Sequence, residues 1–177
     1  MDAEKIFLIT DHEGYSPQIS RLLSMMNYAR FTTINTVKGL NRDQLDYLHD
    51  SECNSIGALL SHIAAVEFGY QIWTFEKREL NEEELNQWRP ALELGDLGRQ
   101  NIKNQDLDFY INLLDEVRQK TLEEFRNRND KWINEETSFW GNKQANNYFK
   151  WFHVFEDEIN HRGQMRWIKK RLPKESI

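Results

Sequence analysis

Apolar residues recur every three or four positions along four long stretches of the chain, and this period is the feature that most limits the folds open to it. Ser16-Pro17 is a favourable helix start, and Gly39 can close the helix that follows. The predicted long helices cover residues 16–39, 54–73, 107–125 and about 145–171. Apart from KIFLIT near the N-terminus, no segment alternates convincingly as a strand would. The pattern therefore predicts an all-α fold, a four-helix bundle with one long crossover connection.

The segments between these helices carry different signals. Residues 41–50 are short and polar, which predicts a helical turn or two. In the connection over residues 77–104, NEEELNQW predicts a helical turn, whereas Pro90, Gly95 and Gly98 predict irregular structure after it. A connection of this length within a compact domain is often a lid or a crossover. Residues 127–147 are predicted to be a loop region.

Length and charge exclude several classes of protein. The chain has 177 residues, which predicts a single domain over residues 1–177. Its net charge of −6 argues against a nucleic-acid-binding face, and no stretch is apolar and long enough to span a membrane. Cys53 stands alone, so no internal disulfide forms, and the N-terminus lacks the features of a signal peptide. We expect a cytoplasmic protein.

Polar residues on the predicted helices are the candidates for a functional site, because bundles build their sites from side chains on facing helices. His62 lies on the apolar face of the second long helix, where a lone histidine is more often hydrogen-bonded than a metal ligand. Asp157 and His161 lie four residues apart on the last helix, so the two side chains can meet one ion. An Asp–His ion pair that stabilises the helix is the alternative.

Other polar and aromatic residues have two interpretations each. Glu67 supports the site or forms a salt bridge, and His153 adds a polar group or packs as an aromatic ring. Trp140 lines a pocket mouth or anchors its loop. Gly163 within a helix implies close approach of another backbone or ring, and Arg162 can pair with a carboxylate on a neighbouring helix. Both are interpreted as packing devices that place the last helix, not as catalysts.

Four segments together resemble the DinB/YfiT-like family (DinB superfamily) of small bacterial metal-binding proteins. The similar segments are GLNRDQLDYLHDSECNSIGALLSHIAAVEFGY, WRPALELGDLG, DLDFYINLLDEVRQKTLEEF and HRGQ. HRGQ is the most specific of the four, and the resemblance covers most of the chain. It implies a four-helix bundle, often dimeric, with a divalent metal held by three histidines, one on the second long helix and two at i, i+4 on the last.

The residues that this resemblance implies as metal ligands are His62, Asp157 and His161. Asp157 departs from the family pattern, which has histidine at this position. A two-histidine, one-carboxylate set suits Zn, Ni, Fe or Mn as the divalent ion. Alternatively, aspartate is too short to reach, and the site is weak or lost.

The resemblance also implies candidate activities. Some relatives transfer low-molecular-weight thiols such as bacillithiol or mycothiol to small electrophiles, so the first hypothesis is a metal-dependent thiol S-transferase, or a related metal-assisted transfer or hydrolysis. The second is a non-catalytic dimeric stress-response or binding protein with a degenerate metal site.

Aromatic residues on the last helix predict a partner. They occur on several of its sides, more than one bundle core can cover, which favours a homodimer. They are Tyr148, Phe149, Trp151, Phe152, Phe155 and Trp167.

Overall fold

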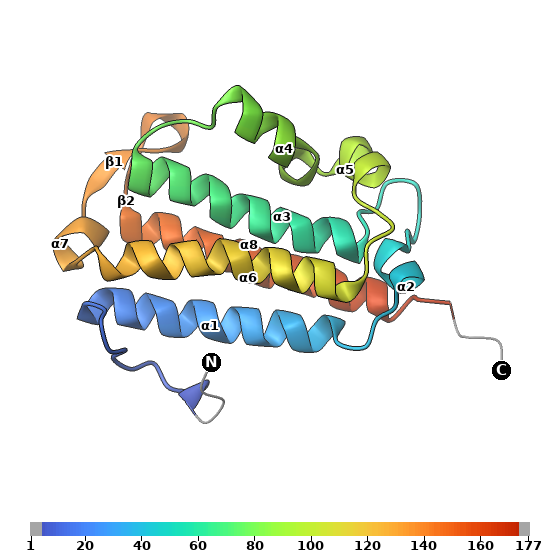
Figure 1. Cartoon of the computed structure of the whole chain (residues 1–177), viewed down its shortest axis with the longest axis horizontal. Helices are drawn as coiled ribbons and strands as arrows, with labels where there is room; N and C mark the ends of the chain where they lie inside the picture. The colour runs from blue at the N-terminus through green and yellow to red at the C-terminus, as the bar shows by residue number, and fades with distance from the viewer. Residues whose placement is uncertain (1–4, 174–177) are drawn as a thin grey trace.

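The computed structural model describes residues 5–173, which are mostly helical (Figure 1). A π-helical segment, Ile72–Glu76, continues α3, and a 3₁₀ turn, Trp140–Asn142, joins the two strands. The remaining elements are α1 (Pro17–Val37), α2 (Arg42–Asp46), α3 (Ile56–Gln71), α4 (Glu82–Glu93), α5 (Gly95–Asn101), α6 (Leu107–Arg126), α7 (Asp130–Ile133), β1 (Glu136–Ser138), β2 (Gln144–Asn146) and α8 (Asn147–Lys169).

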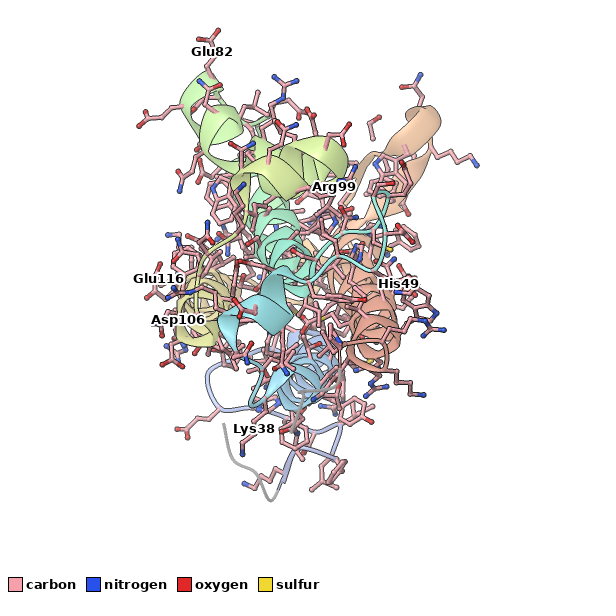
Figure 2. All side chains as sticks on the ribbon, turned by 90° about the vertical axis from the view of Figure 1, so that its right-hand side faces the viewer. Lys38, His49, Glu82, Arg99, Asp106 and Glu116 are labelled. Carbon is pink, nitrogen blue, oxygen red and sulfur yellow. The ribbon has the colours of Figure 1, made fainter. Side chains whose placement is uncertain are left out.

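The four long helices α1, α3, α6 and α8 lie side by side, and the end-on view shows them around a common centre (Figures 1 and 2). α1 packs on α8, and α3 packs on α6, α8 and α4. Other helices cover α3 on both sides, which explains why its residues are apolar on nearly every side. The predicted all-α four-helix bundle is confirmed.

Side-chain caps fix where most of the long helices begin. Ser55, Asp106 and Asn146 each accept a hydrogen bond from a backbone N–H in the first turn of α3, α6 and α8. α1 begins with Pro17 as expected, but the Ser16 side chain makes no capping bond. The connection after α1 turns at Gly39, whose φ of +80° suits glycine.

Two hydrophobic clusters fill the bundle, and a buried layer of charges separates them along every long helix. Arg30 of α1, Glu67 of α3, Arg118 of α6 and Glu158 of α8 are all almost fully buried. Arg30 contacts Glu67 at 3.0 Å and Glu158 at 3.1 Å, and Arg118 contacts Glu67 at 2.7 Å. Glu67 therefore forms a salt bridge, the second of its two interpretations.

The connection over residues 77–104 is more regular than predicted. A capping box between Asn81 and Glu84 starts α4, which continues through Pro90, and α5 follows directly. Trp88 and Ala91 are buried against α3, and this burial outweighs the local preference of Pro90 for a break. The prediction of irregular structure after residue 88 was wrong.

The strands of the structure lie where a loop was predicted. β1 and β2 pair antiparallel with Thr137 opposite Ala145, and α7 precedes them. KIFLIT, the one candidate strand, forms none over Lys5–Thr10. Three-residue strands are too short to leave an alternating pattern. Between residues 5 and 173, no helix combines the length and apolar character needed to cross a membrane.

Candidate metal centre

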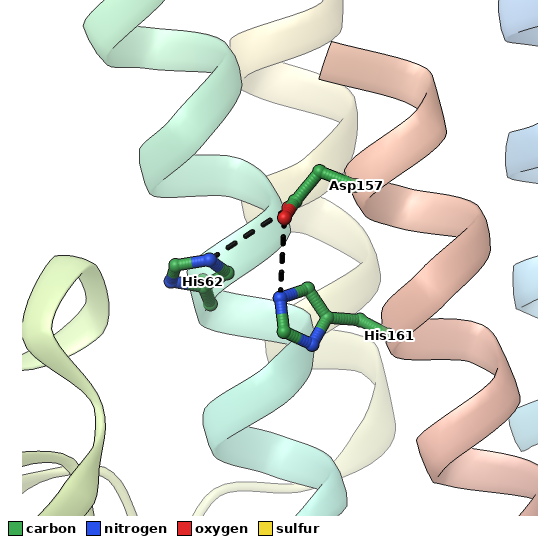
Figure 3. A group of neighbouring side chains, drawn as sticks. All are labelled: His62, Asp157 and His161. Atoms are coloured by element: carbon green, nitrogen blue, oxygen red, sulfur yellow. Dashed lines mark ion pairs between the residues drawn. The ribbon is translucent and has the colours of Figure 1, made fainter. Parts of the chain in front are cut away.

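His62, Asp157 and His161 converge in the space between α3 and α8 (Figure 3). Each offers one ligand atom, and these atoms all lie within 4.8 Å of one another. His62 projects from α3, while Asp157 and His161 project from adjacent turns of α8. The sequence named these three residues, and the fold brings them together.

The Asp157 carboxylate lies between the two imidazole rings. His161 Nε2 is 3.3 Å from Asp157 Oδ1, and His62 Nε2 is 3.7 Å from Asp157 Oδ2. The side chains of His62, Asp157 and His161 are 14, 20 and 12% exposed, so the three groups are largely shielded from solvent. Aspartate at this position is thus long enough to meet both rings.

Outer partners orient both imidazoles. His62 Nδ1 donates to the backbone carbonyl of Ala91 in α4 at 2.7 Å, and His161 Nδ1 donates to Gln164 Oε1 at 3.2 Å. Because both partners are oxygen acceptors, each Nδ1 carries the hydrogen of the neutral ring. Each Nε2 then turns its lone pair toward Asp157, which is the arrangement of metal-binding histidines with a carbonyl behind them.

The centre therefore consists of three hydrogen-bond acceptors, the two imidazole Nε2 atoms and the Asp157 carboxylate, and no hydrogen-bond donor of the described residues lies between them. Asp157 Oδ2 is buried and has no hydrogen-bond partner within residues 5–173. A buried carboxylate without a partner is costly, and a cation at this position would satisfy it. Two imidazole nitrogens and one carboxylate oxygen form a donor set that fits a divalent transition-metal ion.

The three groups also influence one another's protonation. Burial lowers the pKa of His62 below its ordinary value. Burial would also lower the pKa of His161, but the hydrogen bond and charge of Asp157 outweigh it and raise that pKa. Burial would raise the pKa of Asp157, but His161 and His62 outweigh it and lower that pKa. A proton on His161 Nε2 and a metal ion therefore compete for the same space.

His153 and Trp140 lie outside this triad. His153 Nδ1 is 3.1 Å from the hydroxyl of Tyr70, and the two rings stack with centroids 5.8 Å apart. Trp140 meets the His153 ring edge-to-face at 4.9 Å and is 60% exposed. His153 thus packs as an aromatic ring while it hydrogen-bonds Tyr70, and Trp140 both contacts α8 through His153 and lines a surface pocket.

Two expectations for the HRGQ motif were wrong. Arg162 donates to the hydroxyl of Thr32 on α1 rather than to a carboxylate. Gly163 is exposed, and a Cβ built on it would meet nothing within 4 Å, so no neighbouring backbone or ring requires a glycine there.

Sequence reasoning missed the two outer partners. Gln164 lies three residues after His161, a spacing that places two side chains on one helix face, so the sequence carried a usable signal. Ala91 acts through its backbone carbonyl, and no side-chain pattern reveals that role.

Comparison with known protein families identifies the family of the chain. The family model described as Mycothiol-S-transferase matches residues 21–173, a range that includes all three residues of the triad. No curated protein matches the sequence. The helical bundle and the extent of this match show that the chain belongs to the mycothiol-S-transferase family, a DinB/YfiT-like family.

Proposed function

We propose that this protein is a divalent-metal-dependent thiol S-transferase whose metal ligands are His62, Asp157 and His161. The observation that carries the proposal is the cluster of three acceptors around the unpaired Asp157 Oδ2. The family match supports a thiol as the substrate. A divalent ion bound here would lower the pKa of a coordinated thiol and so favour the nucleophilic thiolate at neutral pH.

The protein's own residues prepare this centre. The bonds from His62 to Ala91 and from His161 to Gln164 hold both rings with Nε2 facing inward. The negative charge of Asp157 offsets part of the charge of a divalent ion. In the transfer to a bromobimane, the thiol loses its proton to solvent, its sulfur forms a bond to the bromomethyl carbon, and the carbon–bromine bond breaks to release bromide.

A specific observation also favours the second candidate, a non-catalytic binding protein with a degenerate site. His161 Nε2 lies 3.3 Å from Asp157 Oδ1, and the pKa of His161 is raised. A proton on His161 would pair with Asp157 without any metal. In this alternative the three residues stabilise the junction of α3 and α8.

A transfer assay with and without metal distinguishes the candidates. Mycothiol and bacillithiol are tested separately with a bromobimane as the electrophile, using metal-free protein and protein loaded with zinc, nickel, manganese or iron(II). We expect only metal-loaded protein to raise the rate of transfer above that of the uncatalysed reaction between the thiol and the bromobimane. His62→Ala and His161→Ala should each lose stoichiometric metal and transfer together.

His153→Ala is the matched control, because His153 lies on α8 one turn before Asp157 but outside the triad. This variant should keep its metal. Stoichiometric metal in the wild type without transfer of either thiol would favour the binding protein. Absence of bound metal from the wild type under every loading condition would contradict the metal centre itself.

We further propose that the protein forms a homodimer. α8 buries Trp151 and Phe155 in its own bundle but leaves Phe149 46% and Phe152 40% exposed. Exposed aromatic side chains of this size favour a protein–protein interface.

A further inference from the structure

A surface groove of about 610 Å³ begins beside the triad, between the loop that precedes α3 and the last turns of α8. Gln164 belongs to both places, because it lines the groove and its Oε1 accepts the Nδ1–H of His161. The groove therefore adjoins the centre through Gln164, the residue that lines the one and orients a ring of the other. The residues of the groove used below are Cys53, Asn54, Asn160, Gly163, Gln164 and Trp167.

Gly163 is the least explained residue of this groove. It lies within α8, where glycine weakens a helix relative to alanine. Its φ is not positive, it is exposed, and a Cβ would meet nothing within 4 Å. Neither backbone conformation nor packing among the described residues requires glycine, whereas close approach of a ligand to the backbone would.

The opposite wall of the groove is held in place by hydrogen bonds. Asp50 Oδ1 accepts from the backbone N–H groups of Glu52 at 2.9 Å and Cys53 at 2.8 Å. Arg99 of α5 donates to the carbonyls of Glu52 at 3.0 Å and Cys53 at 3.2 Å, and Figure 2 shows Arg99 beside this loop. Asn54 Oδ1 accepts from Gly95 N at 3.0 Å. A wall fixed in advance reduces the entropy lost on binding.

The groove combines amide groups with an aromatic ring. Its described lining contains the amides of Asn54, Asn160 and Gln164 and the carboxylate of Glu52. Trp167 is 42% exposed, and the Arg171 guanidinium lies over its ring at 3.7 Å from the centroid. The ring of His49 meets Trp167 edge-to-face at 4.8 Å. Amides beside an aromatic ring favour a ligand that carries several hydrogen-bonding groups on an apolar frame.

We infer that this groove binds the non-reacting part of the thiol substrate and that Gly163 determines specificity by leaving room for it. The identity of the ligand rests on the proposed function. Gly163 touches neither the triad nor the reacting sulfur in this assignment. Its substitution should therefore change the binding of a thiol with a long tail and spare a thiol without one.

The test uses the full chain loaded with zinc and compares Gly163→Ala and Gly163→Leu with the wild type. Calorimetric titration measures the binding of mycothiol and bacillithiol, and N-acetylcysteine serves as the short thiol. For the long thiol that binds the wild type more tightly, we expect the dissociation constant and KM to rise several-fold in Gly163→Ala and at least tenfold in Gly163→Leu. Metal content, kcat and the binding of N-acetylcysteine should stay unchanged, and the melting temperature of Gly163→Ala should rise.

Gly69→Ala is the matched control, since Gly69 also lies within a helix and its Cβ would meet nothing within 4 Å. This variant should raise the melting temperature without changing the affinity for any of the three thiols.

The inference is overturned if folded, metal-loaded Gly163→Leu binds the long thiol as the wild type does. It is also overturned if the wild type binds neither long thiol or if N-acetylcysteine loses affinity equally. Gly163-dependent binding without transfer would instead contradict the proposed function and support the groove assignment.

Discussion

At the scale of single residues, the hydrogen bonding of the Asp157 carboxylate depends on whether a metal ion lies between His62 and His161. It is within 3.3 Å of one imidazole nitrogen and 3.7 Å of the other, and Oδ2 has no hydrogen-bond partner within residues 5–173. An ion pair with protonated His161 leaves Oδ2 unsatisfied. A divalent ion would satisfy the carboxylate and both rings together.

Substitution of Asp157 tests this difference. Asp157→Asn keeps the size of the side chain but removes its charge, and we expect the affinity for zinc to fall at least about tenfold. Asp157→His should retain or tighten the binding of zinc and nickel, because imidazole suits these ions. Metal content after dialysis against zinc, nickel, manganese and iron(II) measures both effects. Metal uptake by Asp157→His but not by the wild type would mean that the natural site is degenerate.

The pH dependence of metal binding should follow His161. Imidazole binds metal only when neutral, and Asp157 raises the pKa of His161 above the ordinary value of about 6.5. As the solution is acidified, His161 should begin to take up a proton while the pH is still above ~6.5, and zinc affinity should begin to fall at that point. In metal-free protein the raised pKa contributes stability below pH ~6.5, which is lost as pH rises through the folded value.

Calorimetric zinc titrations between pH 6 and 8 measure this dependence. Asp157→Asn is the informative comparison, since loss of the carboxylate should return the pKa of His161 toward its ordinary value. The onset of proton competition should then move to lower pH. An unchanged onset in Asp157→Asn would contradict the coupling between Asp157 and His161.

At the residue level, the sequence singled out residues that the structure places together, and the metal site that they were predicted to form stays a prediction. Asp157 and His161 were identified from their i, i+4 spacing, His62 from its place on an apolar helix face, and the resemblance then implied all three as ligands. Gly163 was misinterpreted because a glycine within a helix has the same sequence signature whether a helix, a ligand or solvent faces it. Only coordinates distinguish these surroundings.

At the scale of elements, each long helix contributes one charge to the layer that divides the core. Of these residues the sequence indicated only Glu67 as a salt-bridge partner. Pairing among Arg30, Glu67, Arg118 and Glu158 depends on how four helices rotate toward a common axis, and periodicity along one helix does not reveal that. The long helices themselves were predictable because their periodic segments are long.

Glu67 should contribute strongly to stability as part of this layer. Glu67→Gln keeps the shape but leaves Arg30 and Arg118 facing a neutral group, and removal of one partner from a buried ion pair costs about 3–5 kcal/mol. Burial would raise the pKa of Glu67, but Arg118 and Arg30 outweigh it and lower the pKa. Its contribution is thus present above pH ~4.3 and lost as pH falls through the lowered value.

Urea unfolding at pH 7 and at pH 3 measures this contribution. Glu67→Gln should lose most at pH 7 and depend less on pH than the wild type. Glu93→Gln is the control, because Glu93 pairs with Arg89 on an exposed part of α4. Equal losses in the two variants would contradict a special role for the buried layer.

α4 and α5 should open more readily than the bundle helices. α4 rests on α3 through Trp88 and Ala91, and most of its other residues are exposed or only partly buried. Its Ala91 carbonyl holds His62 at 2.7 Å, so immobilisation of His62 by metal should also steady α4. Hydrogen exchange should be faster in α4 and α5 than in α3 and should slow in α4 when zinc binds. Equal protection that metal leaves unchanged would contradict a lid.

At the scale of the whole molecule, apolar side chains remain exposed along one face. The N-terminal segment leaves Phe7, Leu8 and Ile9 between 56 and 76% exposed. These three residues line a groove of about 290 Å³ together with Tyr28 of α1 and Ile159 of α8. The aromatic residues of α8 predicted an interface from sequence alone, but the bundle buries part of that set. The N-terminal segment was not included in the sequence prediction.

A second copy of the chain is the partner we expect on this face, and the dimer is testable in solution. Light scattering coupled to gel filtration at micromolar concentration should give twice the mass of one chain. Leu8→Asp and Ile159→Asp each place a charge among exposed apolar side chains, which should cost little in the isolated chain but disrupt an apolar interface. Both variants should become monomeric with helical content and zinc binding unchanged. Phe109→Asp is the control, because Phe109 is 44% exposed on α6 and does not line this groove, so this variant should remain dimeric.

A monomeric wild type at this concentration would contradict the dimer. A dimer that both substitutions leave intact would place its interface elsewhere, and Phe149 and Phe152 of α8 would be the next residues to substitute.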